Sequence, residues 1–338
     1  MVLVTRGWDR LKKKTGLALC LAMIFLLSFA TYGEVKDHSQ SLSPRQEMIK
    51  LVQELRQYAR AQKSDFVCIG NNGLELMMEK DELVSENELS GMLAGFDGML
   101  LESFFYGSDM ESNKRTPLEH RMYLMDALKR FQGAGKPVFN IEYANDPEIM
   151  GSAYRQSQRA GLIPLAADRR ELNNIPQYPA TVWEENASPI TKLGEARNFL
   201  ALFNPDRFET KEEYLQALER SRYDVLIIDA EYQGEWLEPA DVARLQRKPN
   251  GVRRLVLSYF SIGEAESYRA YWKEEWNKKP PAWIVELNQD WEHNYRVKYW
   301  APEWKQILYG SPSAQLDRIL QAGFDGVFLD VVDVYQYL

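Results

Sequence analysis

Two segments of the sequence are built alike, and each ends in an acidic residue. Gly95–Glu102 and Gly323–Asp330 both read Gly-Phe-Asp-Gly, then three apolar residues, then the acid. The apolar triplet is typical of a strand buried on both faces. A carboxylate at the end of such a strand is costly unless it is solvated or paired, so it usually lies at a functional site. We therefore predict Glu102 and Asp330 as a catalytic carboxylate pair for general acid–base or nucleophilic work. Each could instead cap the element that follows.

A third acid and several polar or aromatic residues follow other apolar runs. Asp229 comes directly after Leu226–Ile228 and is a further catalytic candidate, with a structural role equally open. Residues predicted to contact substrate are Asn72, Tyr106, Glu142, Tyr259, Glu264, Tyr295, Trp300 and Asp333. The alternatives for these residues are loop hydrogen bonding and, for the aromatic ones, simple packing. Arg169 is more in keeping with loop hydrogen bonding than with substrate binding.

The elements that would position these residues alternate between strands and helices. Eight strands are expected, and the alternation predicts a (β/α)8 TIM barrel in the α/β class. The expected strands are Phe66–Gly70, Met99–Leu101, Pro137–Ile141, Leu162–Ala166, Phe199–Phe203, Val225–Ile228, Leu255–Phe260 and Val327–Leu329.

The stretch that follows the Leu255–Phe260 strand is rich in tryptophan. Tyr268–Tyr309 holds six of the nine tryptophans and is too long for an ordinary connection. It is therefore predicted to form a cap over the ends of the strands.

The two ends of the barrel pattern are incomplete. The first helix, which begins at Ser43-Pro44, has no strand before it, and the last strand has no helix after it. Both gaps close if residues 34–338 form one circularly permuted barrel, in which the Phe66–Gly70 strand lies parallel and adjacent to the Val327–Asp330 strand. Its halves would be 43–170 and 193–338, joined by a Pro-rich linker at 171–192. The alternative is a chain that joins halves of two separate barrels.

The first residues resemble an export signal. Arg6, Arg10 and Lys12–Lys14 precede an apolar run at Gly16–Ala30, and small residues lie at Thr31 and Gly33. This order predicts a signal peptide at 1–33 with cleavage near Gly33 and a secreted or periplasmic protein, free of the membrane after cleavage. An uncleaved membrane anchor is the alternative.

The net charge and the few cysteines and histidines limit the kinds of ligand and cofactor that the protein is expected to bind. The net charge is −8, and removing 1–33, which carries five bases and one acid, leaves about −12. Such a surface disfavours nucleic acid and attracts cationic ligands. Cys68 would be the only cysteine, so no intrachain disulfide is expected. The three histidines are scattered, which predicts neither a metal site nor a cofactor. The sequence does not indicate an oligomeric state.

Several motifs together resemble one enzyme family. Tyr259–Glu266, Asn294–Trp300 and Gly323–Asp333 resemble glycoside hydrolase family 114, the TIM-barrel family of endo-α-1,4-polygalactosaminidase. The similarity is closest to its uncharacterised bacterial and archaeal branch. Asn72-Gly73 and Glu102–Tyr106 resemble the same family, but they precede the linker here and follow the Asp330-type strand there.

The resemblance implies an exported, metal-independent glycoside hydrolase that acts on an extracellular, cationic amino-sugar polysaccharide. Glu102 and Asp330 would then form the acid and nucleophile-or-base pair of glycoside cleavage. Characterised members carry a glutamate where Phe328 stands and an aspartate near Lys298. Because of these departures, a non-catalytic protein that binds the polysaccharide or assists its assembly is the alternative function.

Overall fold

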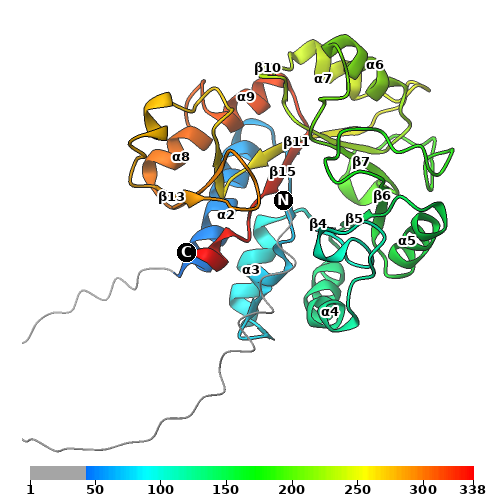
Figure 1. The fold of residues 1–338 in the computed structure, drawn as a ribbon, viewed down its shortest axis with the longest axis horizontal. Helices are drawn as coiled ribbons and strands as arrows, with labels where there is room; N and C mark the ends of the chain where they lie inside the picture. Colours follow the sequence, from blue (N-terminus) through cyan, green and yellow to red (C-terminus); the bar gives the residue numbers. More distant parts are fainter. Residues whose placement is uncertain (1–42) are drawn as a thin grey trace, which may run out of the picture.

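The computed structural model describes residues 43–338 and is built around one sheet of eight parallel strands (Figure 1). The strand order is β6-β5-β4-β1-β15-β11-β8-β7, and the edge strands β6 and β7 approach each other without pairing. The sheet is therefore a nearly closed barrel, and the predicted TIM-barrel class is confirmed. The strands are β1 (Val67–Asn71), β4 (Gly98–Glu102), β5 (Val138–Tyr143), β6 (Ile163–Ala167), β7 (Phe199–Leu202), β8 (Val225–Ile228), β11 (Leu255–Ser261) and β15 (Gly326–Asp330).

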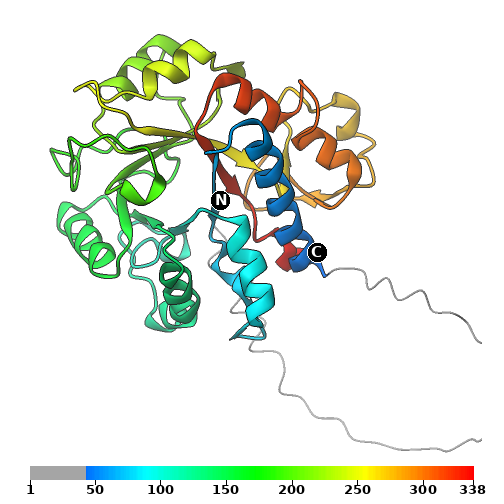
Figure 2. The same cartoon turned by 180° about the vertical axis from the view of Figure 1, so that it is seen from behind.

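Helices surround the barrel, as the two opposite views show (Figures 1 and 2). The first begins at a capping box in which Ser43 and Gln46 bond each other's backbone amides, with Pro44 in its first turn. No helix within residues 43–338 is both long and apolar enough to cross a membrane. The helices are α2 (Pro44–Gln62), α3 (Glu86–Gly95), α4 (Leu118–Gly133), α5 (Pro147–Arg159), α6 (Lys211–Arg220), α7 (Pro239–Leu245), α8 (Pro302–Leu308) and α9 (Gln315–Ala322).

The first and last strands of the described chain pair with each other. β1 lies parallel to β15 from Val67 opposite Gly326 to Gly70 opposite Leu329. The approach is close enough that a Cβ on Gly326 would lie 2.2 Å from the Val67 carbonyl oxygen, so only glycine fits there. The predicted pairing of these strands is confirmed, and circular permutation stays a prediction. The predicted signal peptide lies outside the described residues.

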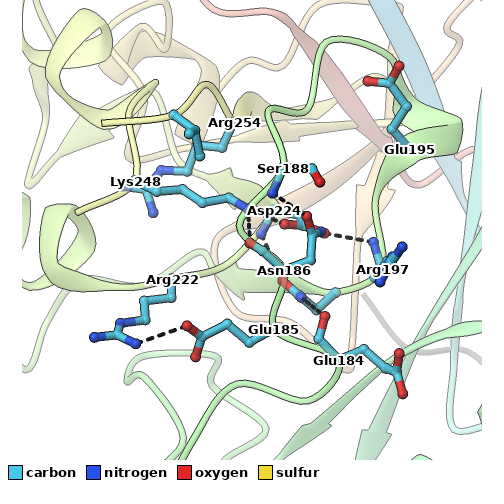
Figure 3. Close-up of polar contacts among 12 residues, drawn as sticks. Glu184, Glu185, Asn186, Ser188, Glu195, Arg197, Arg222, Asp224, Lys248 and Arg254 are labelled. Atoms are coloured by element: carbon cyan, nitrogen blue, oxygen red, sulfur yellow. Dashed lines mark hydrogen bonds and ion pairs between the residues drawn. The ribbon is translucent and has the colours of Figure 1, made fainter. Parts of the chain in front are cut away.

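An aspartate directly before each of three strands accepts a hydrogen bond from a neighbouring segment. Asp97 accepts a hydrogen bond from the Cys68 amide at 3.0 Å, and Asp325 accepts one from the Val256 amide at 2.9 Å. Asp224 accepts one from the Arg197 amide at 2.8 Å and also forms a buried ion pair with Lys248 (Figure 3). The repeated Gly-Phe-Asp-Gly motif thus joins adjacent strands at the amino-terminal end of the barrel.

The connection between β6 and β7 covers that same end. Ile190, Leu193 and Ala196 belong to the apolar cluster inside the barrel, and Leu193 lies against Gly98 at the start of β4. The predicted linker, 171–192, falls within this connection. The packing of the β6–β7 connection closes the amino-terminal end of the barrel, so a functional site is expected at the opposite end.

Strand β12 and the tryptophan-rich segment form a small antiparallel sheet, β12-β14-β13, together with α8. We call these elements the cap, and their position over the ends of the barrel strands stays a prediction. Trp272, Trp276, Trp283 and Trp304 contact one another in series, with ring centroids 5.2–5.3 Å apart. The Trp304 indole donates to the Ile262 carbonyl at 2.9 Å, which attaches the segment just beyond β11. Its strands are β12 (Glu264–Glu266), β13 (Ile284–Leu287) and β14 (Asn294–Val297).

Short elements complete the connections. They are η1 (Gly73–Met77), β2 (Met78–Glu79), β3 (Glu82–Leu83), η2 (Ser108–Met110), η3 (Leu193–Glu195), β9 (Glu231–Tyr232), β10 (Glu235–Trp236), η4 (Glu274–Asn277) and η5 (Val334–Tyr337).

Candidate active site

Alternate residues of each strand face the barrel interior because side chains alternate along a strand. Leu100, Ile141 and Phe328 belong to the apolar cluster that fills the interior. The residues two positions further along β4 and β15 are Glu102 and Asp330, at the carboxyl ends of their strands. We call this end the barrel mouth. The repeated register therefore brings both predicted acids to the same mouth.

Asn71, the last residue of β1, bridges the two acids. Its Nδ2 donates to Glu102 Oε1 at 2.8 Å and to Asp330 Oδ1 at 2.9 Å. These two acceptor oxygens are therefore at most about 5.7 Å apart, the sum of 2.8 Å and 2.9 Å. Carboxyl groups about 5–5.5 Å apart are typical of retaining glycosidases, whereas inverting enzymes separate theirs by about 6.5–9.5 Å.

Further hydrogen bonds hold each acid in place. The Tyr143 hydroxyl donates to Glu102 Oε2, and the Glu102 amide donates to Asn72 Oδ1 at 3.0 Å. Asp330 Oδ1 also accepts from the Val331 amide at 2.9 Å. Asn72, predicted to contact substrate, therefore supports the backbone of Glu102.

The backbone turns in the same way after each of these strands. Asn72, Ser103 and Val331, which follow Asn71, Glu102 and Asp330, have φ values of 49°, 57° and 59°. This left-handed conformation suits asparagine but is unfavourable for β-branched valine. Such strained positions cluster at functional sites.

Burial raises the pKa of Glu102, and the Asp330 charge raises it further, while bonds from Tyr143 and Asn71 act in the opposite direction. The nearby Asp330 charge disfavours a negative charge on Glu102, so Glu102 tends to keep its proton. Glu102 can therefore supply a proton beside a second carboxyl group.

Glu102 lines a cavity on one side of the mouth. Asn72, Glu75, His120 and Asp333 line it too. Burial raises the pKa of Asp333 to about 7, and the Asp330 charge contributes to this rise. Asp333, predicted to contact substrate, therefore lies near the pair and shares its electrostatic field.

Asp229 lies at the end of β8 in an ion pair. Arg269 Nη1 and Nη2 donate to its two carboxylate oxygens at 2.9 and 2.7 Å, and Arg269 Nε donates to Glu266 at 2.8 Å. The Tyr259 hydroxyl donates to Glu266 at 3.2 Å, and Tyr259 and Asp229 line a second cavity. Both carboxylate oxygens of Asp229 are therefore bound by the Arg269 guanidinium.

Glu264 is buried in the first strand of the cap sheet. Its carboxylate accepts from Asn288 Nδ2 at 2.8 Å and from Asn294 Nδ2 at 3.2 Å. Burial raises its pKa, and the Asp330 charge adds to the effect. Glu264 therefore belongs to the electrostatic surroundings of the pair, on the side of the cap.

Four predicted substrate residues make contacts away from the pair. Glu142 accepts from the amides of Phe105 and Tyr106 and from Asn140 Nδ2, so it holds the loop after β4. The Tyr106 hydroxyl lies 3.2 Å from Ser152 Oγ on α5. Tyr295 and Trp300 pack within the cap, against Trp272 and Tyr299 respectively.

Three residues that the sequence reasoning did not select hold the site together. Asn71 and Tyr143 contact Glu102 directly, and Arg269 pairs with Asp229. Asn71 and Tyr143 end their strands as Glu102 does, so strand-end position was the available signal for them. Arg269 had no such signal. Arg169 is exposed. The next residue, Arg170, places its guanidinium 4.2 Å from the centroid of the Tyr143 ring.

The two departures from the family pattern lie in different surroundings. Phe328 is fully buried, two residues before Asp330, and packs on Phe203 with ring centroids 5.2 Å apart. Lys298 is exposed at the end of the cap sheet. Within residues 43–338, no three or more His, Cys, Asp or Glu side chains are grouped so as to hold a metal ion.

Comparison with known proteins places this chain among relatives of unstated function. It is 36% identical over 154 residues to an uncharacterised protein of Methanocaldococcus jannaschii, covering 45% of this chain and 41% of that relative. It is 38% identical over 122 residues to an uncharacterised protein of Deinococcus radiodurans, covering 36% and 37%. The matches span less than half the length of these relatives.

A solved structure and a family profile also match. The structure is Aspergillus fumigatus Ega3 in complex with galactosamine, at 22% identity, with a TM-score of 0.26, covering 41% of this chain and 44% of that one. The profile of Glycoside-hydrolase family GH114 matches residues 29–184 and 204–337, which is most of the sequence. By this match the chain belongs to glycoside hydrolase family GH114.

Proposed function

We propose that this protein is an exported glycoside hydrolase that cleaves an extracellular amino-sugar polysaccharide with Glu102 and Asp330. The observation that carries the proposal is the Asn71 bridge, which holds one oxygen of each buried carboxyl group at most about 5.7 Å apart, less than the separation typical of inverting glycosidases. Membership of GH114 supports the reaction class.

The proposed reaction has two steps. Protonated Glu102 gives its proton to the glycosidic oxygen while ionised Asp330 attacks the anomeric carbon, so the leaving sugar departs and a glycosyl–Asp330 ester forms. Glu102, now ionised, takes a proton from water. The hydroxide equivalent attacks the anomeric carbon and releases Asp330. The second step restores both protonation states.

Charge at the mouth supports a cationic substrate. The Asp330 charge raises the pKa values of Glu102, Glu264 and Asp333 there, and the Glu75 charge also raises that of Asp333. Such an excess of acids raises the local concentration of a polymer that carries free amines. A polygalactosamine-like chain has the required charge and glycosidic linkages.

We propose export on the strength of the basic and apolar segments within 1–33. Expression of the full chain with analysis of the external fraction tests this proposal. The secreted protein should begin near Glu34 by intact mass. A product that retains Met1, or that stays in the membrane fraction, contradicts cleavage.

The activity test measures new reducing ends from de-N-acetylated polygalactosamine, with chitosan and a neutral galactan as comparisons. We expect Glu102→Gln and Asp330→Asn each to lower kcat by about 10²-fold or more, since each removes an acid–base or nucleophilic group. The double variant should be little worse than either single one. Asp126→Asn, an exposed change on α4, is the control and should keep wild-type activity.

Two results would contradict this proposal. Full activity in both single variants would remove the pair from the reaction. A wild-type protein that cleaves none of the polymers but binds one, with binding retained in both variants, would establish the non-catalytic binding function instead.

Stereochemistry tests the spacing argument separately. NMR of the first products should show the anomeric configuration of the substrate, because a double displacement at about 5.7 Å or less retains it. An inverted first product would exclude Asp330 as the nucleophile.

A further inference from the structure

Asn71 is the residue in the mouth that contacts both acids and has no assigned role. It ends β1, and its side chain is buried, with 3% of the residue exposed. Both protons of its amide nitrogen are directed to carboxylates, Glu102 on β4 and Asp330 on β15. Asn71 therefore joins side chains from three adjacent strands.

The orientation of this amide follows from its acceptors. If oxygen and nitrogen were exchanged, the carbonyl oxygen would face two carboxylate oxygens, and the three acceptors would repel one another. The observed orientation leaves Asn71 Oδ1 without a hydrogen-bond partner among the described residues. A buried acceptor without a partner is costly. The hydrogen bonds of the Asn71 side chain among the described residues therefore go to the two acids.

We infer that Asn71 is a positioning residue for the reaction, acting as a fork that fixes the spacing of Glu102 and Asp330 and influences the protonation of Glu102. The inference rests on the proposed function for its catalytic meaning. Asn71 has no direct role in bond making.

The physical effect of the fork has a definite sign. Hydrogen bonds donated to a carboxylate favour its ionised form, and the Asn71 bond lowers the pKa of Glu102 in this way. Without the donor, the pKa of Glu102 rises. The proposed reaction needs Glu102 protonated, so the alkaline limb of the activity–pH profile moves to higher pH.

Other groups around the pair titrate or carry charge, and they stay in place in the variants below. They come from β5, β11, β12, η1, α4, the turn after β15 and the turn after β6. They are Tyr143, Tyr259, Glu264, Glu75, His120, Asp333 and Arg170.

The test uses two changes at Asn71 and one control. Asn71→Leu removes the donor and keeps the number and branching of the side-chain heavy atoms. Asn71→Asp keeps the shape but replaces the donor with a third carboxylate, so its effect should be larger. Asn87→Leu makes the first of these changes at an exposed position of α3. Circular dichroism and thermal unfolding establish that each variant is folded, and Asn71→Asp carries the test if Asn71→Leu does not fold.

The measurement that does not depend on activity is ¹³C NMR of the carboxyl groups. The Glu102 and Asp330 signals are assigned from their loss in Glu102→Gln and Asp330→Asn. We expect the Glu102 titration to move up by about one pH unit in Asn71→Leu and further in Asn71→Asp, with no change in Asn87→Leu. Both Asn71 variants should also lower kcat at least about tenfold, and the alkaline limb of the pH profile should follow the Glu102 titration.

The outcomes separate this inference from the proposed function. An unchanged Glu102 titration in a folded Asn71 variant would overturn the fork, whatever the activity. A wild-type protein that cleaves no polymer, together with the expected titration shift, would overturn the hydrolase proposal while supporting Asn71 as a group that influences the protonation of Glu102. A lower kcat with an unmoved alkaline limb would also count against the fork.

Discussion

Individual acids in this protein differ in protonation because their surroundings differ. Burial raises the pKa of Glu102 within the mouth. Glu212 on α6 is exposed and accepts bonds from Arg244 and Gln216, which lower its pKa to about 2. The same side chain therefore favours its protonated form in the mouth and its ionised form on the surface.

Asp333 provides a test of this contrast through stability. Its folded pKa is about 7, above the ordinary aspartate value, mainly through burial. Between about pH 4 and pH 7 the folded protein keeps a proton that the unfolded chain has released, so this group makes stability fall as pH rises over that window. Urea unfolding should therefore show a smaller loss of midpoint between pH 4.5 and pH 7.5 in Asp333→Asn than in wild type. An equal loss in both proteins would contradict the raised pKa.

At the scale of elements, the two ends of the barrel strands carry residues with different roles. The start of a strand carries structural aspartates, such as Asp224, which accepts from Asn186 Nδ2 at 2.6 Å, from the Arg197 amide and from buried Lys248. The end of a strand carries the polar groups of the mouth. This division matches the general separation of stability and chemistry between the two faces of a barrel.

The buried Asp224–Lys248 pair allows the contribution of the amino-terminal end of the barrel to the free energy of unfolding to be measured. Asp224→Ala should lower the free energy of unfolding by about 3–5 kcal/mol, because it leaves a buried ammonium without its partner. The double variant Asp224→Leu/Lys248→Met removes both charges and should recover much of the loss. Urea unfolding with Asp126→Ala as the control measures both effects. A loss below about 1 kcal/mol in Asp224→Ala would show that the pair is not needed.

At the scale of the whole molecule, the barrel closes through strands distant in sequence. β1 pairs with β15, and α2 lies beside α9, with the Tyr58 hydroxyl 2.6 Å from Asp317 Oδ1. The start of α2 and the C-terminus are neighbours in both views (Figures 1 and 2). The unpaired edges, β6 and β7, lie instead at the predicted linker. This arrangement is the one a circularly permuted barrel would have.

A rearranged chain tests that arrangement. We expect a protein that begins at Ser188, joins Leu338 to Ser43 through a short Gly-Ser linker and ends at Ala187 to fold into the same barrel. Ala187 and Ser188 are exposed, and the pairing of β1 with β15 is retained. Circular dichroism should match the parent over 43–338, with one cooperative thermal transition. An insoluble product or a non-cooperative transition would show that the present order is required.

The sequence by itself determined the barrel, the pairing of its first and last strands and the delivery of Glu102 and Asp330 to one mouth. These follow from local rules, because alternation along a strand decides which residues face inward and a repeated motif repeats that register. Only the tertiary structure decided that Asn71 bridges the acids and that Arg269 forms an ion pair with Asp229. It also decided that Glu142 bonds the loop after β4 and that Tyr106 contacts α5. Asn71 and Asp330 are separated by 259 positions in the chain. Contacts over such separations depend on which strands become neighbours when the barrel closes, and no local pattern specifies the partner of a single side chain.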